Sequence, residues 1–567
     1  MSSLPLPLSL DTLADSASAL SERIDTLLGG QHTSVSRKVL VVTGGALASY
    51  QLVKASYFLY RHFFCFGGLP RLKNPSWLAG NFVELTGPDT LEVQKEWVRE
   101  HGQTFVVNYI LGGKRLFTTD AKAIAHILAT YPRSDEARLQ LARVMAPGHG
   151  LFNVEGEGHK IQRKVMNPAF GPIQLRDLTH IFVEKANSLR DAWLDQIGDA
   201  PSKRINVVAW LVKMTLDVIG LAGFNYHFNA LKPNSGPNEL NDAFNYLFRA
   251  DENPTKLFLG LFLPFIDWIP TERGRGEQRA LDTMGRIGRE LLTEAKAAAI
   301  EEQRSGVKSR ARDLLSLLVK ANMAEGANKM CDNDVLAQIP TFLLAGHETT
   351  STSTSWTLFS LAQNPAVQTR LREELRTLGT DTPTMDELAE SSLPYLDAVA
   401  REALRLHSPI PFAARKAPRD DVIPLAHPYT DGRGRVHREL RLNKEDSIII
   451  PIYAMNTTEE VWGPDATSFN PDRWLEGGAA APQKNGLPGL WGNQMTFTGG
   501  MHSCIGYRFS LFEMKALLFS LVKAFEFELA TPVEDVGVQM FIVRRPMLKS
   551  DKEGGAQLPL LIKPVQS

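Results

Sequence analysis

The stretch FTGGMHSCIG, residues 497–506, is the most informative part of this chain. It places Cys504 directly ahead of apolar residues at helical spacing: Ile505, Phe509, Phe512, Leu517, Leu521 and Phe525. Backbone N–H groups at a helix N-terminus favour a charged thiolate. Gly499, Gly500 and Gly506 leave the backbone open to a flat group. The stretch therefore predicts a soft anionic ligand in an apolar slot, which suits a metal such as iron.

Written as Phe497-x-x-Gly500-x-His502-x-Cys504-x-Gly506, this stretch resembles the haem-binding loop of the cytochrome P450 family at every fixed position of that motif. In that family the cysteine thiolate is the axial ligand of the haem iron and favours O–O cleavage. The residue that matches His502 contacts a haem propionate. The resemblance implies haem b, iron protoporphyrin IX, as the cofactor.

The whole chain has the composition of an ordinary globular protein. Of its 567 residues, 43% are hydrophobic and 22% are charged, and a formal net charge of -1 gives no reason to expect nucleic acid as a partner. The positions of Cys65, Cys331 and Cys504 suggest neither a disulfide framework nor a zinc cluster. The resemblance implies a mainly α fold with a small β region, in one catalytic domain over residues 67–567.

The N-terminal part has a different character. Between Lys38 and Arg61 the sequence VLVVTGGALASYQLVKASYFLY is about as long as the ~20 residues that a membrane-spanning helix needs. Gln51 and Lys54 interrupt it, so two shorter re-entrant segments or a buried core helix are alternatives. We predict a membrane anchor over residues 37–66, with membrane lipid as a partner. A microsomal P450 of this kind is expected in the endoplasmic reticulum membrane, with its catalytic domain facing the cytosol.

Residues 1–36 are predicted to form an extension with an acidic amphipathic helix. Such a helix binds anionic lipid poorly, so it is expected to pack on the protein or to dip into a neutral surface. Its apolar positions are Leu10, Leu13, Ala17, Leu20, Ile24 and Leu27.

A second informative stretch lies within residues 334–364, whose apolar positions predict a long buried helix. Its middle reads AGHETTSTSTS, with hydroxyl side chains at every position of Thr349–Ser355. These side chains can bond back to helix carbonyls, Gly346 lacks a side chain and Pro340 lacks an N–H group. A local break in the helix, opening a groove, is therefore predicted.

The segment Ala345–Thr350 resembles the oxygen-activation segment of the same family. Glu348 matches the acid of that segment and Thr349 its threonine, which together relay the protons that O2 reduction requires. Both are predicted to be catalytic. His347 stands at a variable position and is expected to be no more than a satisfied side chain.

A third constellation is predicted to be structural. Glu402 and Arg405 share one helix face, and the downstream segment WGPDATSFNPDRW, residues 462–474, resembles the proline-rich meander of the family. Its Arg473 matches the arginine that completes a buried network with the other two. We interpret this trio as scaffold for the proximal side of the haem, so its loss should strand a buried charge.

Three further residues match positions that contact the haem propionates. Arg163 lies in HKIQRKVMNPAF and Arg415 in PFAARKA. His159 stands where many relatives carry tryptophan, although imidazole can also donate to a carboxylate. All three are predicted to bind the cofactor.

By resemblance, the substrate-facing residues come from the loop 138–152, the helix near residue 342, the strand 410–414 and the turn 541–543. These residues are mostly apolar or small, which predicts a lipophilic small molecule as the substrate. The candidates are Phe342, Ala345, Ile410, Phe412, Ala413, Phe541 and Ile542.

The sequence therefore predicts a membrane-anchored haem-thiolate monooxygenase that uses O2 for C–H hydroxylation or epoxidation. No dinucleotide fingerprint follows Cys504, so a separate NADPH–cytochrome P450 reductase is implied as the electron source. The segments 338–356 and 462–474 look similar to fungal members, many of which tailor terpenoids or other secondary metabolites. The alternatives are a haem-thiolate isomerase or peroxygenase, a non-catalytic haem-binding protein, and an α-rich membrane protein without haem.

Overall fold

The computed structural model describes most of the chain. The described residues are 45, 49–50, 52–53, 56, 66–87, 90–135, 150–232, 238–248, 272–306, 313–324, 329–475, 486–540 and 543–565. The predicted extension 1–36 lies outside them, as do most of the predicted anchor 37–66 and the predicted substrate residues Phe541 and Ile542.

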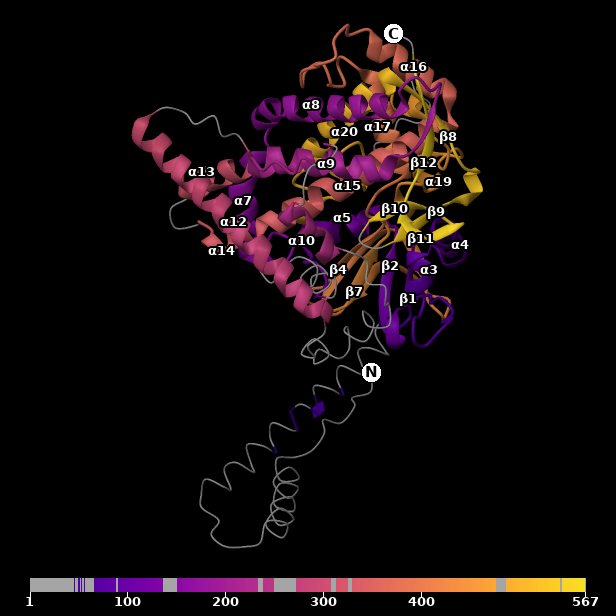
Figure 1. The fold of residues 1–567 in the computed structure, drawn as a ribbon. Coiled ribbons are helices and arrows are strands. Elements are labelled where there is room, and N and C mark those ends of the chain that lie inside the picture. Colours follow the sequence, from indigo (N-terminus) through magenta and orange to yellow (C-terminus); the bar gives the residue numbers. More distant parts are fainter. Residues whose placement is uncertain are drawn as a thin grey trace, which may run out of the picture.

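Helices form most of the described structure, and Figure 1 shows α8, α9 and α15 passing side by side through its upper part. The helices are α3 (Phe82–Thr86), α4 (Thr90–His101), α5 (Ala121–Thr130), α7 (Gly156–Met166), α8 (Pro172–Ile197), α9 (Val207–Phe224), α10 (Glu239–Phe248), α12 (Glu272–Ser305), α13 (Leu314–Ala324), α14 (Asp332–Leu336), α15 (Gln338–Gln363), α16 (Pro365–Arg376), α17 (Pro394–Leu406), α18 (Ile452–Met455), α19 (Glu459–Trp462) and α20 (Tyr507–Ala524). The predicted mainly α fold is confirmed.

The strands form small sheets at one side of the molecule (Figure 1). Their orders are β1-β2-β7-β4, β11-β10-β9, β3-β12-β8 and β5-β6, and within the first sheet β2 and β7 pair in parallel. The strands are β1 (Thr104–Asn108), β2 (Lys114–Thr118), β3 (Lys203–Asn206), β4 (Ala413–Lys416), β5 (Asp421–Thr430), β6 (Val436–Leu442), β7 (Ser447–Ile450), β8 (Phe525–Leu529), β9 (Val536–Met540), β10 (Arg544–Leu548), β11 (Asp551–Ala556) and β12 (Pro559–Pro564).

Local sequence signals explain several helix boundaries. The helices α8, α16 and α17 each begin with proline, which has no N–H group to leave unpaired in the first turn. Asp120 caps α5 by accepting a hydrogen bond from Ala123 N over 2.9 Å. The helix α9 ends at Asn225, which takes the left-handed conformation that favours asparagine among non-glycine residues.

The core is organised around α15, which packs against α9, α17, α20 and β10. Gly346 permits the close approach of α9, because a Cβ atom there would lie 2.8 Å from Ile219 Cδ1. Among the described residues, α9 is the one helix that is long and apolar enough to span a membrane, with a mean hydropathy of 1.7. Most of it is buried, which is how a core helix of a folded domain behaves.

The predicted break in the hydroxyl-rich helix is wrong. A turn at Ala337 separates α14 from α15, but α15 then runs continuously from Gln338 to Gln363. Pro340 falls in its first turn, where no intrahelical hydrogen bond is lost. The hydroxyl groups bond back along the helix, as in the 2.7 Å bonds from Thr349 Oγ1 to Ala345 O and from Thr357 Oγ1 to Ser353 O. Their polar groups are thereby satisfied without interrupting the helix.

Candidate active site

Cys504 lies in the loop that leads into α20. Its backbone N–H donates to Phe497 O over 3.0 Å, and the N–H of Gly506 bonds the thiol. The Cys504 side chain has accessible surface, yet burial by the surrounding protein raises the pKa of its thiol, more than Gly506 and the charge of Arg163 lower it. The accessible surface therefore lies inside the molecule, where a bound group can meet the sulfur.

The glycines of this loop serve the protein's own packing. A Cβ atom at Gly499 would lie 1.9 Å from Pro488 O, and one at Gly500, where φ is +67°, would lie 2.0 Å from Leu128 O. The prediction that these two glycines make room for a flat group is therefore wrong. Gly506 differs, because the nearest atom to its added Cβ would be Phe170 Cε1, at an ordinary 3.6 Å.

Behind the loop, the predicted trio forms a buried charge network. Glu402 Oε1 lies 2.7 Å from Arg405 Nη2 and 3.1 Å from Arg473 Nε, and all three side chains are fully buried. Trp474 Nε1 donates to Glu402 Oε2 over 2.9 Å, and the N–H of Asn470 donates to Glu402 Oε1 over 3.0 Å. The carboxylate of α17 thus fixes the meander, whose Trp462 and Ala466 carbonyl groups accept further guanidinium protons.

A second cluster combines basic groups from four parts of the chain. The rings of His159 and His502 lie 4.3 Å apart between centroids, and His502 Nε2 lies 3.0 Å from Glu155 Oε2. Arg133 pairs with Arg415 in an isolated β-bridge, and its Nη1 is 3.9 Å from Glu155 Oε1. Glu155 is the acidic partner that the structure gives this cluster. Arg133 and Glu155 belong to this site although sequence reasoning did not select them.

Burial lowers the pKa values of two groups in this cluster. It lowers the pKa of His159 to about 4 and that of Arg415 to about 10, with further lowering from the neighbouring cations. His159 Nε2, Arg415 Nε and His502 Nδ1 are buried and have no hydrogen-bond partner in the described structure. Buried donors of this kind call for an anion, and carboxylates match them in charge and geometry. The cluster therefore fits the propionates of a haem.

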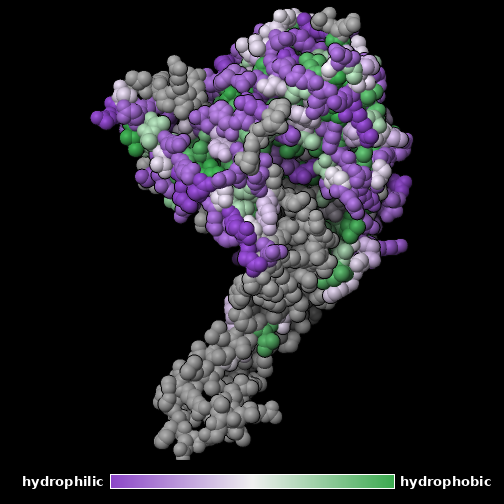
Figure 2. Space-filling model, in the orientation of Figure 1, coloured by the Kyte–Doolittle hydropathy of each residue, from purple (hydrophilic) through white to green (hydrophobic). Residues whose placement is uncertain are grey.

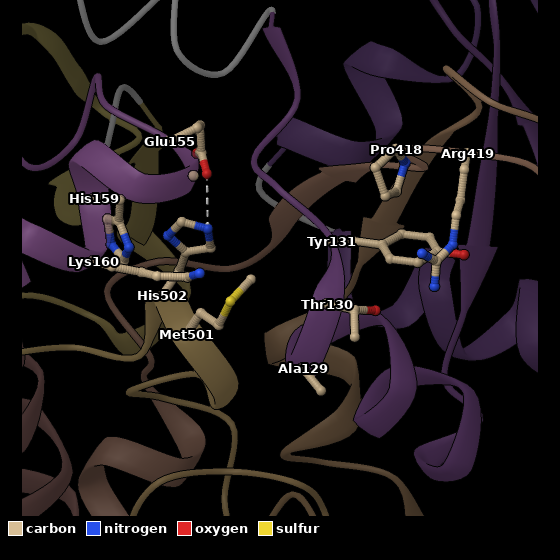
Figure 3. A pocket seen from close by; sticks show the side chains of 11 residues that line it. Ala129, Thr130, Tyr131, Glu155, His159, Lys160, Pro418, Arg419, Met501 and His502 are labelled. Carbon is tan, nitrogen blue, oxygen red and sulfur yellow. Dashed lines mark ion pairs between the residues drawn. The ribbon is translucent and has the colours of Figure 1, made fainter.

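Figure 3 shows the pocket of about 350 Å³ beside this cluster. Glu155, His159 and His502 lie on one side, and Tyr131 and Arg419 on the other, so α7 and the cysteine loop face the end of α5 across it (Figure 3). Arg163 contributes differently from the other predicted residues, because its Nη1 donates to Ser503 O over 2.6 Å. It thereby fixes the backbone next to Cys504.

One face of α15 retains accessible surface. Ala345 and Thr349, one helical turn apart, are half-buried, whereas His347 and Glu348 are buried. The hydroxyl proton of Thr349 is donated to Ala345 O, so its oxygen can accept a proton or a hydrogen bond from this face. The structure thus brings the predicted pair to one place on α15.

Glu348 is held by two basic groups. Its Oε2 lies 2.5 Å from Arg545 Nη2 of β10, and its Oε1 lies 3.4 Å from His347 Nε2. Burial raises the pKa of Glu348, but His347 and Arg545 outweigh it and bring that pKa down to about 2. His347 was predicted to be only a satisfied side chain. Its ring does bond Leu343 O over 2.6 Å, but it also contacts the Glu348 carboxylate.

A second buried carboxyl lies near the same helix. Glu513 of α20 is fully buried, and neither of its oxygens has a hydrogen-bond partner of regular geometry among the described residues. Burial raises its pKa well above the ordinary value, although the nearby Thr350 hydroxyl lowers it in part. The surroundings therefore shift the pKa values of Glu348 and Glu513 in opposite directions, downward for Glu348 and upward for Glu513.

Comparison with known proteins decides what this site is. The family model named Cytochrome P450 matches residues 70–548. The chain is 46% identical over 511 residues to cytochrome P450 monooxygenase 128 of Postia placenta, with 88% of this chain and 92% of that protein covered. The chain belongs to the cytochrome P450 family. Cytochrome P450 monooxygenase 205 of the same fungus is 47% identical, with the same coverage of both chains. Ganoderic acid synthetase CYP5150L8 of Ganoderma lucidum is 33% identical, with 87% of this chain and 92% of that protein covered.

This P450 is a haem-containing monooxygenase, as its family and relatives show. When bound, haem supplies the redox chemistry that activates O2. Cys504 would hold the iron, and His159, His502, Arg415 and Arg133 would face the propionates. The residues present fit the cofactor, because an accessible sulfur inside the protein and unpartnered buried donors occur in one site.

The predicted substrate residues that the structure describes differ in their burial and in their neighbours. Ile410, Phe412 and Ala413 are half-buried next to β4. Phe342 instead packs edge-on to Phe170, with ring centroids 5.7 Å apart, and stacks on Phe224. Its burial among core rings makes it a packing residue in this conformation.

Proposed function

We propose that this P450 oxidises a lipophilic small molecule by C–H hydroxylation or epoxidation, in fungal secondary metabolism such as terpenoid tailoring. The observation that supports this most is the half-buried face of Ala345 and Thr349 on a helix that is mostly buried. The apolar side chains of Ile410, Phe412 and Ala413 are likewise incompletely covered. Apolar surface with a few placed polar groups selects substrates by shape and buried area.

The relatives support the same class of substrate. One of them carries the name ganoderic acid synthetase, and another, 34% identical, is cytochrome P450 monooxygenase claO of Ampulloclitocybe clavipes. Both come from fungi. The chain's own residues would bind the substrate, exclude water from it and pass protons through Glu348 and the Thr349 oxygen.

Supplying this P450 with NADPH–cytochrome P450 reductase, NADPH and isotopic O2 is expected to place one labelled oxygen atom in the product. A substrate can first be found by screening lipophilic compounds, terpenoids included, for a shift in the haem spectrum. Mass spectrometry of the product then measures the label. Product formed without NADPH would favour the isomerase or peroxygenase, and a haem spectrum without product from any spectrally active compound would favour a non-catalytic protein.

We also propose that residues 37–66 anchor the protein in the endoplasmic reticulum membrane, with the catalytic domain in the cytosol. The described residues of this range support it, because Tyr50, Leu52 and Val53 are 63%, 68% and 66% exposed. Figure 2 shows, by contrast, a mainly hydrophilic surface on the folded part. Deleting residues 1–66 is expected to move the protein from the microsomal to the soluble fraction of yeast cells. An undiminished microsomal share would refute the anchor.

A further inference from the structure

The acid of α15 is held by a residue that lies far away in the chain. Arg545 belongs to β10, and its guanidinium lies against the Glu348 carboxylate at 2.5 Å. The contact is an ion pair without regular hydrogen-bond geometry, because the buried Glu348 Oε2 has no hydrogen-bond partner among the residues that the structure describes. An ion pair of this kind depends on the charges of its two groups and on their relative position. A strand can hold the arginine accurately in its position.

The strand that carries Arg545 is itself fastened to the core at the preceding residue. Trp356 Nε1 of α15 donates to Arg544 O over 2.7 Å, and Arg544 N donates to Pro409 O over 2.9 Å. The Arg544 guanidinium lies 3.8 Å from the centre of the Tyr453 ring. The backbone next to Arg545 is thus attached to α15 and to the segment that precedes β4.

This attachment has a chemical consequence for the acid. A carboxylate that faces a guanidinium and an imidazole stays ionised, and an ionised carboxylate has no proton to give. Before Glu348 can take up a proton and pass it towards the Thr349 oxygen, its contact with the guanidinium must weaken. We propose that Arg545 is a positioning residue that keeps Glu348 ionised against β10, so that Glu348 relays protons only when this ion pair opens.

Several titratable groups lie around Glu348, and a test must separate the effect of Arg545 from theirs. The groups that act most strongly on it are His347 on α15 and Arg545 on β10. On the other packed helices, Glu513 of α20 lies near Thr350, and Asp217 of α9 bonds the amides of Ala230 and Leu231. Removing the arginine charge therefore leaves His347 as the main stabiliser of the carboxylate, with burial acting against it.

Arg545→Gln is expected to lower the thermal midpoint of the purified holoenzyme more at pH 8 than at pH 5. In the wild type the lowered pKa of Glu348 stabilises the fold above the ordinary value of 4.5, and this stabilisation disappears only as the pH falls towards about 2. In the variant His347 alone opposes burial, which is the largest single influence on this carboxyl, so the pKa of Glu348 rises and its ionised form stabilises the fold less at high pH. Adding Glu348→Gln should restore part of the loss, because the unpaired charge is then absent.

Arg545→Lys keeps the positive charge, so its thermal midpoint should stay close to that of the wild type. Arg438→Gln, at an exposed arginine of β6, is a matched control in which no shift of the midpoint is expected. A loss in Arg545→Gln that is equal at both pH values and unchanged by Glu348→Gln would overturn the proposal, since the arginine would then act through packing alone.

The kinetic measurement rests on the monooxygenase activity, whereas the thermal one does not. In Arg545→Gln the Glu348 carboxyl is no longer held in position, so product formed per NADPH consumed is expected to fall by about 10²-fold, the lower end of what a positioned proton-transfer group contributes, and to become pH-dependent because the pKa of Glu348 rises. Unchanged coupling at all pH values would contradict the relay role. The wild type could form no labelled product while Arg545→Gln still lost midpoint mainly at pH 8 and Glu348→Gln still restored part of it. In that case the proposed function would fail and the ion-pair assignment would stand.

Discussion

Replacing Cys504 with serine is expected to abolish the thiolate-type absorption of the reduced, carbon monoxide-bound protein and to remove turnover. The sulfur lies inside the protein with accessible surface, next to the Gly506 amide and the positive charge of Arg163. A serine hydroxyl at the same place is a hard, neutral donor that binds iron weakly and donates little electron density to it. Absorption spectra and product analysis measure the two effects.

Cys331→Ser is the matched control for this experiment. Cys331 is the other described free cysteine, is exposed and lies at the start of α14, so its variant should keep the spectrum and the turnover of the wild type. A Cys504→Ser protein that retained the thiolate-type spectrum would show that another residue holds the iron. The assignment of the whole site would then fail.

Glu402→Gln is expected to reduce the free energy of unfolding by about 3 to 5 kcal/mol, the cost of leaving buried charges without their partner. Arg405 and Arg473 both contact the Glu402 carboxylate at full burial, so Arg405 would lose its acidic partner, and Arg473 would keep only Asp465, whose Oδ2 lies 2.8 Å from its Nη2. Denaturant unfolding and the yield of haem-loaded protein measure the loss. No comparable change in the substrate dependence of turnover is expected from the fraction that folds.

Glu390→Gln is the matched control at an exposed ion pair. Glu390 pairs with Arg401 at 2.7 Å, but its side chain is 61% exposed, so water screens the pair and the expected loss is at most about 1 kcal/mol. Equal losses in the two variants would show that the network around Glu402 behaves like a surface pair. The scaffold role would then be wrong.

The sequence predicted the parts of the site that lie within short motifs. Cys504 and His502 share one loop, Glu348 and Thr349 are neighbours, and Arg473 follows from its meander. Their spacing is local, so one sequence carries it. The mainly α fold and the haem were predicted for the same reason, through resemblance to these motifs.

The remaining parts depend on contacts between distant segments. Arg133 reaches the His502 cluster from the end of α5, and Arg545 reaches Glu348 from β10, so nothing near either arginine in the sequence marks its partner. The break predicted at Pro340 failed because a turn at Ala337 starts a new helix just before it. The role predicted for Gly500 failed because the backbone of Leu128 fills the space beside it.

The order of the strands β3-β12-β8 bears on how the protein is made. The central strand of this sheet is β12, and its Leu560 is the register partner of both Ile205 and Leu529. A ribosome that has translated β3 must continue from residue 206 to residue 559 before the partner strand exists. Throughout that interval β3 presents an open edge to other nascent chains, which makes this sheet a natural client for chaperones during synthesis.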